Sequence, residues 1–298
     1  MVTMLLIVFS ALIRIFSNSF LGVYQKKLSN SFSSNFINFL SYSILFFVVL
    51  AFVPVFNSVL SINFSSENSL NLIYFAFLTG LMGAIGNAFQ IKALKLGELS
   101  ILAPINSYKI IFSIIFSFLI LREIPSISAL AGIVLIIFGS YFIFETTKEG
   151  FSFLLLKRKD MQFRIFAVLF TGLEAIFIKK MILLSNSLLA LLLWALSTAV
   201  FSFFFLLFDK KKFAFSKLDL NSWKMFFFLI VSLGVMQFST NILFKLINVS
   251  YALSLFQLSS VLSVVLGYKF FKEKNFIKKL IGSLIMVFGA IVIILFNG

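Results

Sequence analysis

The chain has 298 residues, of which 61% are hydrophobic and only 12% are charged. Soluble domains usually carry about 25% charged residues, so lipid must surround most of these apolar runs. Cysteine, histidine and a phosphate-binding P-loop pattern are absent from the sequence. We therefore predict a protein that is not an enzyme, holds no cofactor or metal, and does not hydrolyse ATP itself. The net charge of +15 does not indicate nucleic-acid binding, because the Lys and Arg residues fall mainly between apolar runs.

Membrane-spanning helices need about 20 mainly apolar residues. The first such run continues past Arg14 without a signal-peptide cleavage pattern, so we interpret it as a spanning helix. The segments that meet the requirement are, in chain order, 4–25, 34–56, 71–93, 99–121, 127–145, 162–182, 187–208, 224–245, 250–271 and 278–296. They are too long for barrel strands and lack apolar–polar alternation. We expect Pro104 to kink the fourth segment, because proline cannot donate a backbone hydrogen bond.

The longest polar break lies near the middle of the chain. A shift of 150 positions aligns the stretches on either side of it, pairing Gly132 with Gly282 and Gly139 with Gly289. The predicted organisation is a first five-helix repeat over 1–146, a basic linker over 147–160 and a second five-helix repeat over 161–298. Since five is odd, the second half must be inserted upside down. The predicted fold class is thus all-α integral membrane, with ten transmembrane helices as two inverted five-helix repeats.

The loops at one end of the predicted bundle hold most of the 25 Lys and Arg residues. The positive-inside rule places those loops in the cytoplasm and both termini outside. The abundance of Lys, Phe, Ile and Asn is typical of AT-rich genomes. We therefore expect a multi-pass protein of a bacterial cell (inner) membrane.

Several motifs resemble the EamA-type repeat of the drug/metabolite transporter superfamily. They are the stretch 93–100, Ala103-Pro104, Leu121-Arg-Glu123 and the glycine pair at 132 and 139, repeated more loosely as 250–253, 271–273 and the glycines at 282 and 289. The resemblance implies a carrier of metabolites, often an exporter. It also implies a cavity lined by helices 1, 3, 4, 6, 8 and 9, with helices 5 and 10 at the periphery, and termini in the cytoplasm. The last point differs from the charge count.

Charged residues in the middle of spanning segments cost about 2.5–3.5 kcal/mol each to insert, so they mark candidate sites. Arg14, Lys109 and Glu174 lie at that depth. Helical spacing adds amides on the same faces or on the other cavity helices. The full set of candidate substrate-binding residues is Arg14, Asn18, Asn87, Gln90, Asn106, Lys109, Glu174, Gln237, Asn241 and Gln257.

Each candidate also has a structural interpretation. Arg14 and Glu174 could form an ion pair that only joins the halves, and the amides could bond between helices. Closely packed backbones would explain the glycines at 80, 83 and 86. We expect Glu123 and Glu273 to pair with loop cations or to cap the starts of helices 5 and 10.

Two cations against one carboxylate predict a substrate with a carboxylate or phosphate, such as an amino acid. Glu174 would pair with a substrate amine or bind a coupling proton. The predicted function is secondary transport of small metabolites by alternating access about a midplane cavity. The expected partners are a small-molecule substrate, the lipid bilayer, and a coupled proton or an exchanged solute, with no nucleic acid. The alternative is a sugar, nucleotide-sugar or lipid-linked-sugar carrier or flippase of the same fold.

Overall fold

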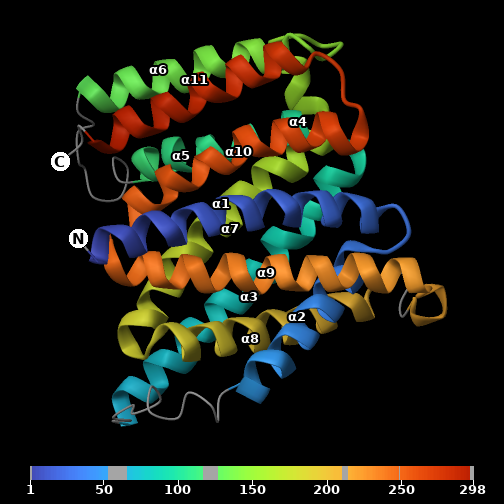
Figure 1. The fold of residues 1–298 in the computed structure, drawn as a ribbon, viewed down its shortest axis with the longest axis vertical. Coiled ribbons are helices and arrows are strands. Elements are labelled where there is room, and N and C mark those ends of the chain that lie inside the picture. The colour runs from blue at the N-terminus through green and yellow to red at the C-terminus, as the bar shows by residue number, and fades with distance from the viewer. Residues whose placement is uncertain (1, 53–65, 117–126, 210–213, 248, 296–298) are drawn as a thin grey trace.

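The computed structural model describes residues 2–52, 66–116, 127–209, 214–247 and 249–295. All regular structure within these ranges is helical, as predicted (Figure 1). The ten predicted segments correspond to α1 Val2–Ser29, α2 Ser34–Phe52, α3 Ser66–Leu96, the group α4 Leu99–Leu102, η2 Pro104–Ser107 and α5 Tyr108–Phe116, α6 Ile127–Phe144, α7 Lys159–Leu184, α8 Ser187–Leu207, α9 Leu220–Leu246, α10 Val249–Phe271 and α11 Phe276–Leu295. Short 3₁₀ turns, η4 Phe153–Lys157 and η5 Phe215–Lys217, lie between helices. The predicted extensions over 53–56 and 117–121 lie outside the described residues.

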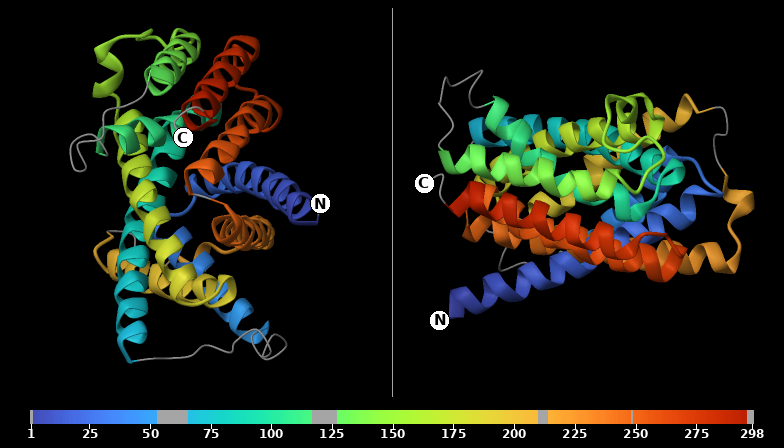
Figure 2. Two further views of the ribbon diagram at one scale, coloured as in Figure 1. Left: turned by 90° about the vertical axis from the view of Figure 1, so that its left-hand side faces the viewer. Right: turned by 90° about the horizontal axis from the view of Figure 1, so that it is seen from above.

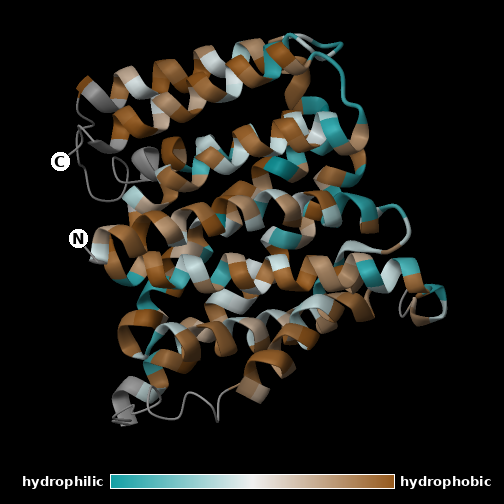
Figure 3. Ribbon diagram, in the orientation of Figure 1, coloured by the Kyte–Doolittle hydropathy of each residue, from teal (hydrophilic) through white to brown (hydrophobic). Residues whose placement is uncertain are grey.

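Seven of the described helices are long and apolar enough to cross a membrane, namely α1, α2, α3, α8, α9, α10 and α11. The fourth segment and α6 have shorter apolar stretches, over Leu99–Phe112 and Leu130–Phe144. The helix α7 is 26 residues long and carries charges within its span. Hydrophobic residues cover most of the helix surfaces, while hydrophilic residues gather in the loops at one end of the bundle (Figure 3). The chain is therefore a multi-pass membrane protein.

In the view from above the helices lie lengthwise beside one another (Figure 2), while Figure 1 shows that α3 and α7 slant across α1 and α9. Each half packs mainly against the other half rather than against itself. The helix α3 lies along α7 and α1 along α9, while α2 pairs with α8 and α6 with α11. The helices α1, α2, α3 and α6 of the first half correspond to α7, α8, α9 and α11 of the second. Exchanging the halves therefore turns the α3–α7 contact into the α9–α1 contact, while the α2–α8 and α6–α11 contacts stay the same. A pseudo-two-fold axis between the repeats requires this pattern.

The contact between α6 and α11 shows the inversion residue by residue. A Cβ atom at Gly132 would lie 2.6 Å from the carbonyl oxygen of Gly289, and one at Gly139 would lie 2.6 Å from that of Gly282. Because the residue numbers rise along one helix and fall along the other, the two helices are antiparallel. The 150-residue shift takes Gly132 to Gly282 and Gly139 to Gly289, so it turns each of the two contacts into the other. The repeated glycines are therefore needed for close backbone approach at the pseudo-symmetric crossing.

The predicted kink at Pro104 is a complete interruption of the helix. The helix α4 ends at Leu102, a 3₁₀ turn follows, and α5 begins at Tyr108. Within the turn, the amide of Asn106 donates to the carbonyl of Ala103 at 3.1 Å, as in a 3₁₀ turn. In a continuous α-helix it would instead donate to the carbonyl of Leu102. The interruption therefore frees the buried Leu102 carbonyl for a side-chain donor.

Candidate functional site

A polar cavity lies between the two halves. Its volume is about 100 Å³, well below the roughly 300–1,000 Å³ of typical ligand pockets. Eight of the ten predicted candidates line it: Arg14, Asn18, Asn87, Gln90, Asn106, Lys109, Glu174 and Gln237. The lining comes from α1, α3, the η2–α5 segment, α7, α9 and α10, which are the helices that the resemblance implied, and also from Tyr42 of α2 and Trp194 of α8. None of the described lining residues belongs to α6 or α11.

Glu174 is the carboxylate of the cavity. Its side chain is buried, and the indole Nε1 of Trp194 donates a hydrogen bond to its Oε1 at 2.7 Å. Space for the carboxylate comes from Gly83 on α3, since a Cβ atom there would collide with Oε1. The neighbouring glycines at 80 and 86 approach Ser197 and Thr171 equally closely. Close backbone packing is thus confirmed at Gly80 and Gly86, whereas Gly83 meets side chains and makes room for the carboxylate.

Arg14 is not paired with Glu174. Its guanidinium lies over the ring of Phe256, with 3.7 Å between the guanidinium carbon and the ring centroid. Its Nε is buried without a hydrogen-bond partner, and among the described residues no ion pair includes Arg14. The structural ion pair that the sequence allowed is therefore not formed in this structure. A cation–π contact holds the guanidinium in place while leaving its other nitrogens available.

Lys109 stands on α5, just after the helix interruption. It is close enough to Arg14, Arg164 and Glu174 to interact with each of them electrostatically. Within the described part of the chain, the ammonium of Lys109 has neither a hydrogen-bond acceptor nor an ion-pair partner. The cavity therefore contains a second cation that no described residue pairs with directly.

Arg164 is a third buried cation, and sequence reasoning missed it. Its Nη1 donates to Oε1 of Gln90 at 3.0 Å, and its Nε donates to the Leu102 carbonyl at 2.8 Å. That carbonyl is the one freed by the interruption at Pro104. Gln90 in turn donates to Oε1 of Gln25 at 2.8 Å. Arg164 lies near the start of the predicted segment 162–182 and is the sixth residue of α7, which begins at Lys159, so depth in the segment gave no signal for it.

The amide side chains bond mostly between or within helices. Asn18 donates to Ser259 Oγ at 2.9 Å, and Asn87 donates to the Tyr42 hydroxyl at 2.9 Å. Gln237 donates to Oδ1 of Asn241 at 2.9 Å. Since each of these three also lines the cavity, the structural interpretation and the site interpretation apply to the same residues.

Two candidates lie away from the cavity. Asn241 is fully buried and donates to the Ser187 carbonyl at 3.0 Å. Gln257 is 3% exposed, donates to the Leu253 carbonyl at 3.0 Å and accepts a hydrogen bond from Ser107 at 3.5 Å. Neither belongs to the described cavity lining. Both amides therefore form hydrogen bonds between or within helices and do not line the cavity.

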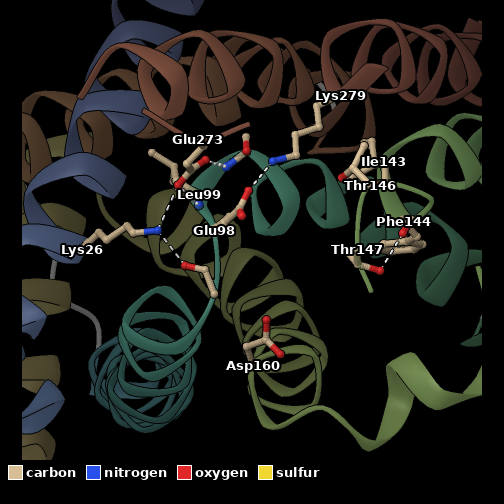
Figure 4. A network of polar contacts seen from close by, with 12 residues as sticks. Lys26, Glu98, Leu99, Ile143, Phe144, Thr146, Thr147, Asp160, Glu273 and Lys279 are labelled. Carbon is tan, nitrogen blue, oxygen red and sulfur yellow. Dashed lines mark hydrogen bonds and ion pairs between the residues drawn. The ribbon is translucent and has the colours of Figure 1, made fainter. Parts of the chain in front are cut away.

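A polar network joins the halves at the end of the bundle where α1 ends and α4 begins (Figure 4). Lys26 bonds both Oε1 of Glu273 at 3.0 Å and the Gly97 carbonyl at 2.7 Å. Glu273 also accepts from the amides of Leu99 and Ser100 at 2.8 and 2.9 Å. Burial opposes ionisation of Glu273, but Lys26 and these amides together lower its pKa below the ordinary value.

The network corrects one expectation and leaves another untested. Pairing of Glu273 with a cation near a loop is confirmed. The expected cap on helix 10 is wrong, because Glu273 caps the start of α4, in the other half, whose first amides have no partner within the helix. Glu123 lies outside the described residues. Beside this network, buried Lys279 of α11 pairs with Glu98.

Comparison with known proteins agrees with this architecture. The model of the EamA-like transporter family matches residues 5–145 and 161–295, one stretch in each half. None of the curated proteins matches the chain. A similar solved structure, described as a crystal structure of a protein, is 16% identical, with a TM-score of 0.69 over 98% of this chain and 97% of that chain. At that identity, the likeness shows the fold alone.

Proposed function

Since the chain belongs to the EamA-like transporter family, a family of membrane transporters, we propose that it carries a small solute bearing a carboxylate or phosphate, such as an amino acid. One observation carries the proposal. Arg14 and Lys109 face the cavity without a hydrogen-bond or ion-pair partner among the described residues, whereas Glu174 is already held by Trp194. An anionic group that binds both cations would complete the site.

The charge balance of the cavity supports an anionic group. Arg14 and Lys109 are two cations and Glu174 is the carboxylate among the described lining residues, and the buried Arg164 adds positive charge close to Lys109. Buried charges are stable only when they are paired and hydrogen-bonded. A substrate carboxylate between Arg14 and Lys109 would supply two charge-assisted hydrogen bonds. Oε2 of Glu174, which has no hydrogen-bond partner among the described residues, would then take a substrate amine or a coupling proton.

The transport cycle would be alternating access. The cavity lies between pseudo-symmetric halves, and rocking of one half against the other would expose it to each side in turn. The Pro104 interruption, which places Asn106 and Lys109 at the cavity, follows the broken-helix design common in secondary transporters. We propose that all ten segments span a bacterial inner membrane, with the basic loops in the cytoplasm and the termini outside.

The alternative sugar or lipid-linked-sugar carrier is less consistent with the site. A neutral sugar would leave Arg14 and Lys109 unpaired. A lipid-linked substrate needs a cavity open sideways to its chain, with cations near the membrane surface, whereas Arg14 and Lys109 lie near the middle of the predicted segments 4–25 and 99–121. A nucleotide sugar satisfies the anion requirement, but it is large for a cavity of about 100 Å³. The small volume favours an amino acid.

The test is transport by the purified chain in proteoliposomes. A panel would contain amino acids, simple carboxylates, neutral sugars and nucleotide sugars, each tested for uptake and for counterflow. We expect an amino acid or a carboxylate to be transported. Arg14→Gln and Lys109→Gln should each reduce transport about ten- to a hundredfold, as expected for loss of a charge-assisted hydrogen bond. Lys224→Gln, which removes an exposed lysine at the start of α9, is the control.

Contrary results are easy to recognise. Wild-type rates in both Arg14→Gln and Lys109→Gln, with normal protein in the membrane, would contradict an anion site. Transport of a neutral sugar in preference to carboxylates would assign the alternative function. Comparing uptake with and without a pH gradient in Glu174→Gln separates proton coupling from amine binding. If Glu174 binds the coupling proton, the variant loses the effect of the gradient but keeps exchange of substrate for substrate.

A further inference from the structure

The linker between the halves borders an apolar groove on the outside of the bundle. The groove has a volume of about 520 Å³ and is separate from the polar cavity. Tyr108 and Phe112 of α5 line one part of it, Met161 and Val168 of α7 line another, and the linker contributes Phe151 to the lining. Almost every lining group is apolar. In a membrane protein, such a groove beside the loops is suited to a lipid acyl chain.

The length of the groove fits within one leaflet. Its lining residues on α7 run from Met161 to Val168. Seven residues at about 1.5 Å each span roughly 10 Å, which is about two thirds of one leaflet's half of the ~30 Å hydrocarbon core. A chain entering from the linker would therefore lie within a single leaflet.

The linker itself has the composition of an interfacial segment. Its 3₁₀ turn η4 exposes large apolar side chains, with Phe153 89% exposed and Leu154 55% exposed. These residues cannot favourably face water at a polar loop. They are explained if the turn lies at the headgroup level, with its apolar side chains in the acyl region.

Exposed lysines lie in the linker next to groove-lining residues, since Lys157 follows Leu156 and Lys159 comes two positions before Met161. Lys148, Lys157 and Lys159 are exposed, and within the described residues none of them forms an ion pair. The neighbouring Arg158 is different, since Asp160 and Glu149 both bind its guanidinium at 2.8 Å. The linker carboxylates are therefore used by Arg158, which leaves the three lysines available for an anion from outside the chain.

We propose that the linker and the groove bind one anionic phospholipid, with its phosphate at Lys157 and Lys159 and an acyl chain in the groove. A second apolar hollow of about 420 Å³ lies on α6 and shares Phe151 with the groove. Two chains of one lipid can thus lie on either side of that ring. The predicted orientation places this end of the bundle in the cytoplasmic leaflet, where anionic lipids are concentrated.

The test measures, with a fluorophore in the groove, how closely a spin-labelled lipid approaches, and it does not depend on transport. Ser152→Cys places one label in the groove lining, and the chain has no native cysteine to remove. The full chain, labelled with a fluorophore, is reconstituted into phosphatidylcholine vesicles that contain small, equal amounts of either phosphatidylglycerol or phosphatidylcholine with a nitroxide on the acyl chain. We expect phosphatidylglycerol to quench the label at a much lower mole fraction.

Charge variants then assign the headgroup. Each lysine near an anionic lipid surface strengthens binding about fivefold. Lys157→Gln combined with Lys159→Gln should therefore raise the mole fraction of phosphatidylglycerol for half-quenching roughly twentyfold. The pair Lys217→Gln and Lys224→Gln removes two exposed lysines elsewhere on the protein and should leave it unchanged. Equal quenching by the two lipids, or an equal effect of the two variant pairs, would overturn the proposal.

Discussion

Gly83→Ala tests the most constrained contact of the cavity. The new Cβ atom would occupy the space of Oε1 of Glu174, so the carboxylate must rotate away. Rotation breaks the 2.7 Å hydrogen bond from Trp194, because Trp194 is buried and cannot follow. Hydrogen bonds to charged groups contribute about 1.5–3 kcal/mol. The expected loss in transport is therefore roughly ten- to a hundredfold.

A matched control separates this contact from the backbone effect of replacing glycine. Gly172, in the middle of α7, has no atom within 4 Å of a Cβ atom built there. Gly83→Ala and Gly172→Ala gain the same helix propensity, about 1 kcal/mol. The difference between them thus isolates the displacement of Glu174. Gly172→Ala should transport at the wild-type rate and unfold at the wild-type temperature or above it.

Tryptophan fluorescence measures the displacement directly. The chain has two tryptophans, and Trp223 is 44% exposed. In a Trp223→Phe background, the emission comes from Trp194 alone, whose indole N–H bonds the carboxylate. Gly83→Ala should change the emission maximum of Trp194, and Gly172→Ala should not. If Gly83→Ala leaves both the emission and the transport rate at wild-type values, the assigned role of Gly83 is wrong.

Three further predictions concern the frame around the cavity. The pKa of Glu273 is lowered in the folded protein, so its stabilising contribution is present above its ordinary value of 4.5 and is lost as the pH falls through the folded value. As the pH is lowered from 7, the melting temperature should therefore fall more steeply for the wild type than for Glu273→Gln. Parallel curves of melting temperature against pH would contradict this. Gly282→Ala places a Cβ atom 2.6 Å from the Gly139 carbonyl oxygen and should lower stability by about 1–3 kcal/mol in thermal unfolding; an unchanged melting temperature would refute the close crossing. Impermeant maleimide should label Thr3→Cys from outside and Ser31→Cys only from the cytoplasm, and the reverse pattern would invert the topology.

Part of the site could be predicted because a charge in the membrane is costly wherever it lies. Arg14, Lys109 and Glu174 were identified by depth alone, and all three line the cavity. Arg164 was missed because it lies near the start of its predicted segment, and its partners, Gln90 and the Leu102 carbonyl, are on other elements. Helical spacing was a less selective guide to the cavity residues than depth. Asn241 lies on the same face of α9 as Gln237, yet it donates to Ser187 on α8, because neighbouring positions on one helix face can meet different helices.

The sequence by itself determined the all-helical membrane fold and the two repeats. Lipid leaves a spanning backbone no hydrogen-bond partners other than its own, so long apolar runs must be helices, and the paired glycines at 132, 139, 282 and 289 record the symmetric crossing of α6 and α11. Only the tertiary structure determined which side chains and amides pair with one another in the site and the network. Glu174 accepts from Trp194 instead of binding Arg14, and Glu273 caps a helix of the other half. Such partners come from helices distant in the chain, and neither hydropathy nor spacing within one helix specifies which distant side chain will fill the space beside it.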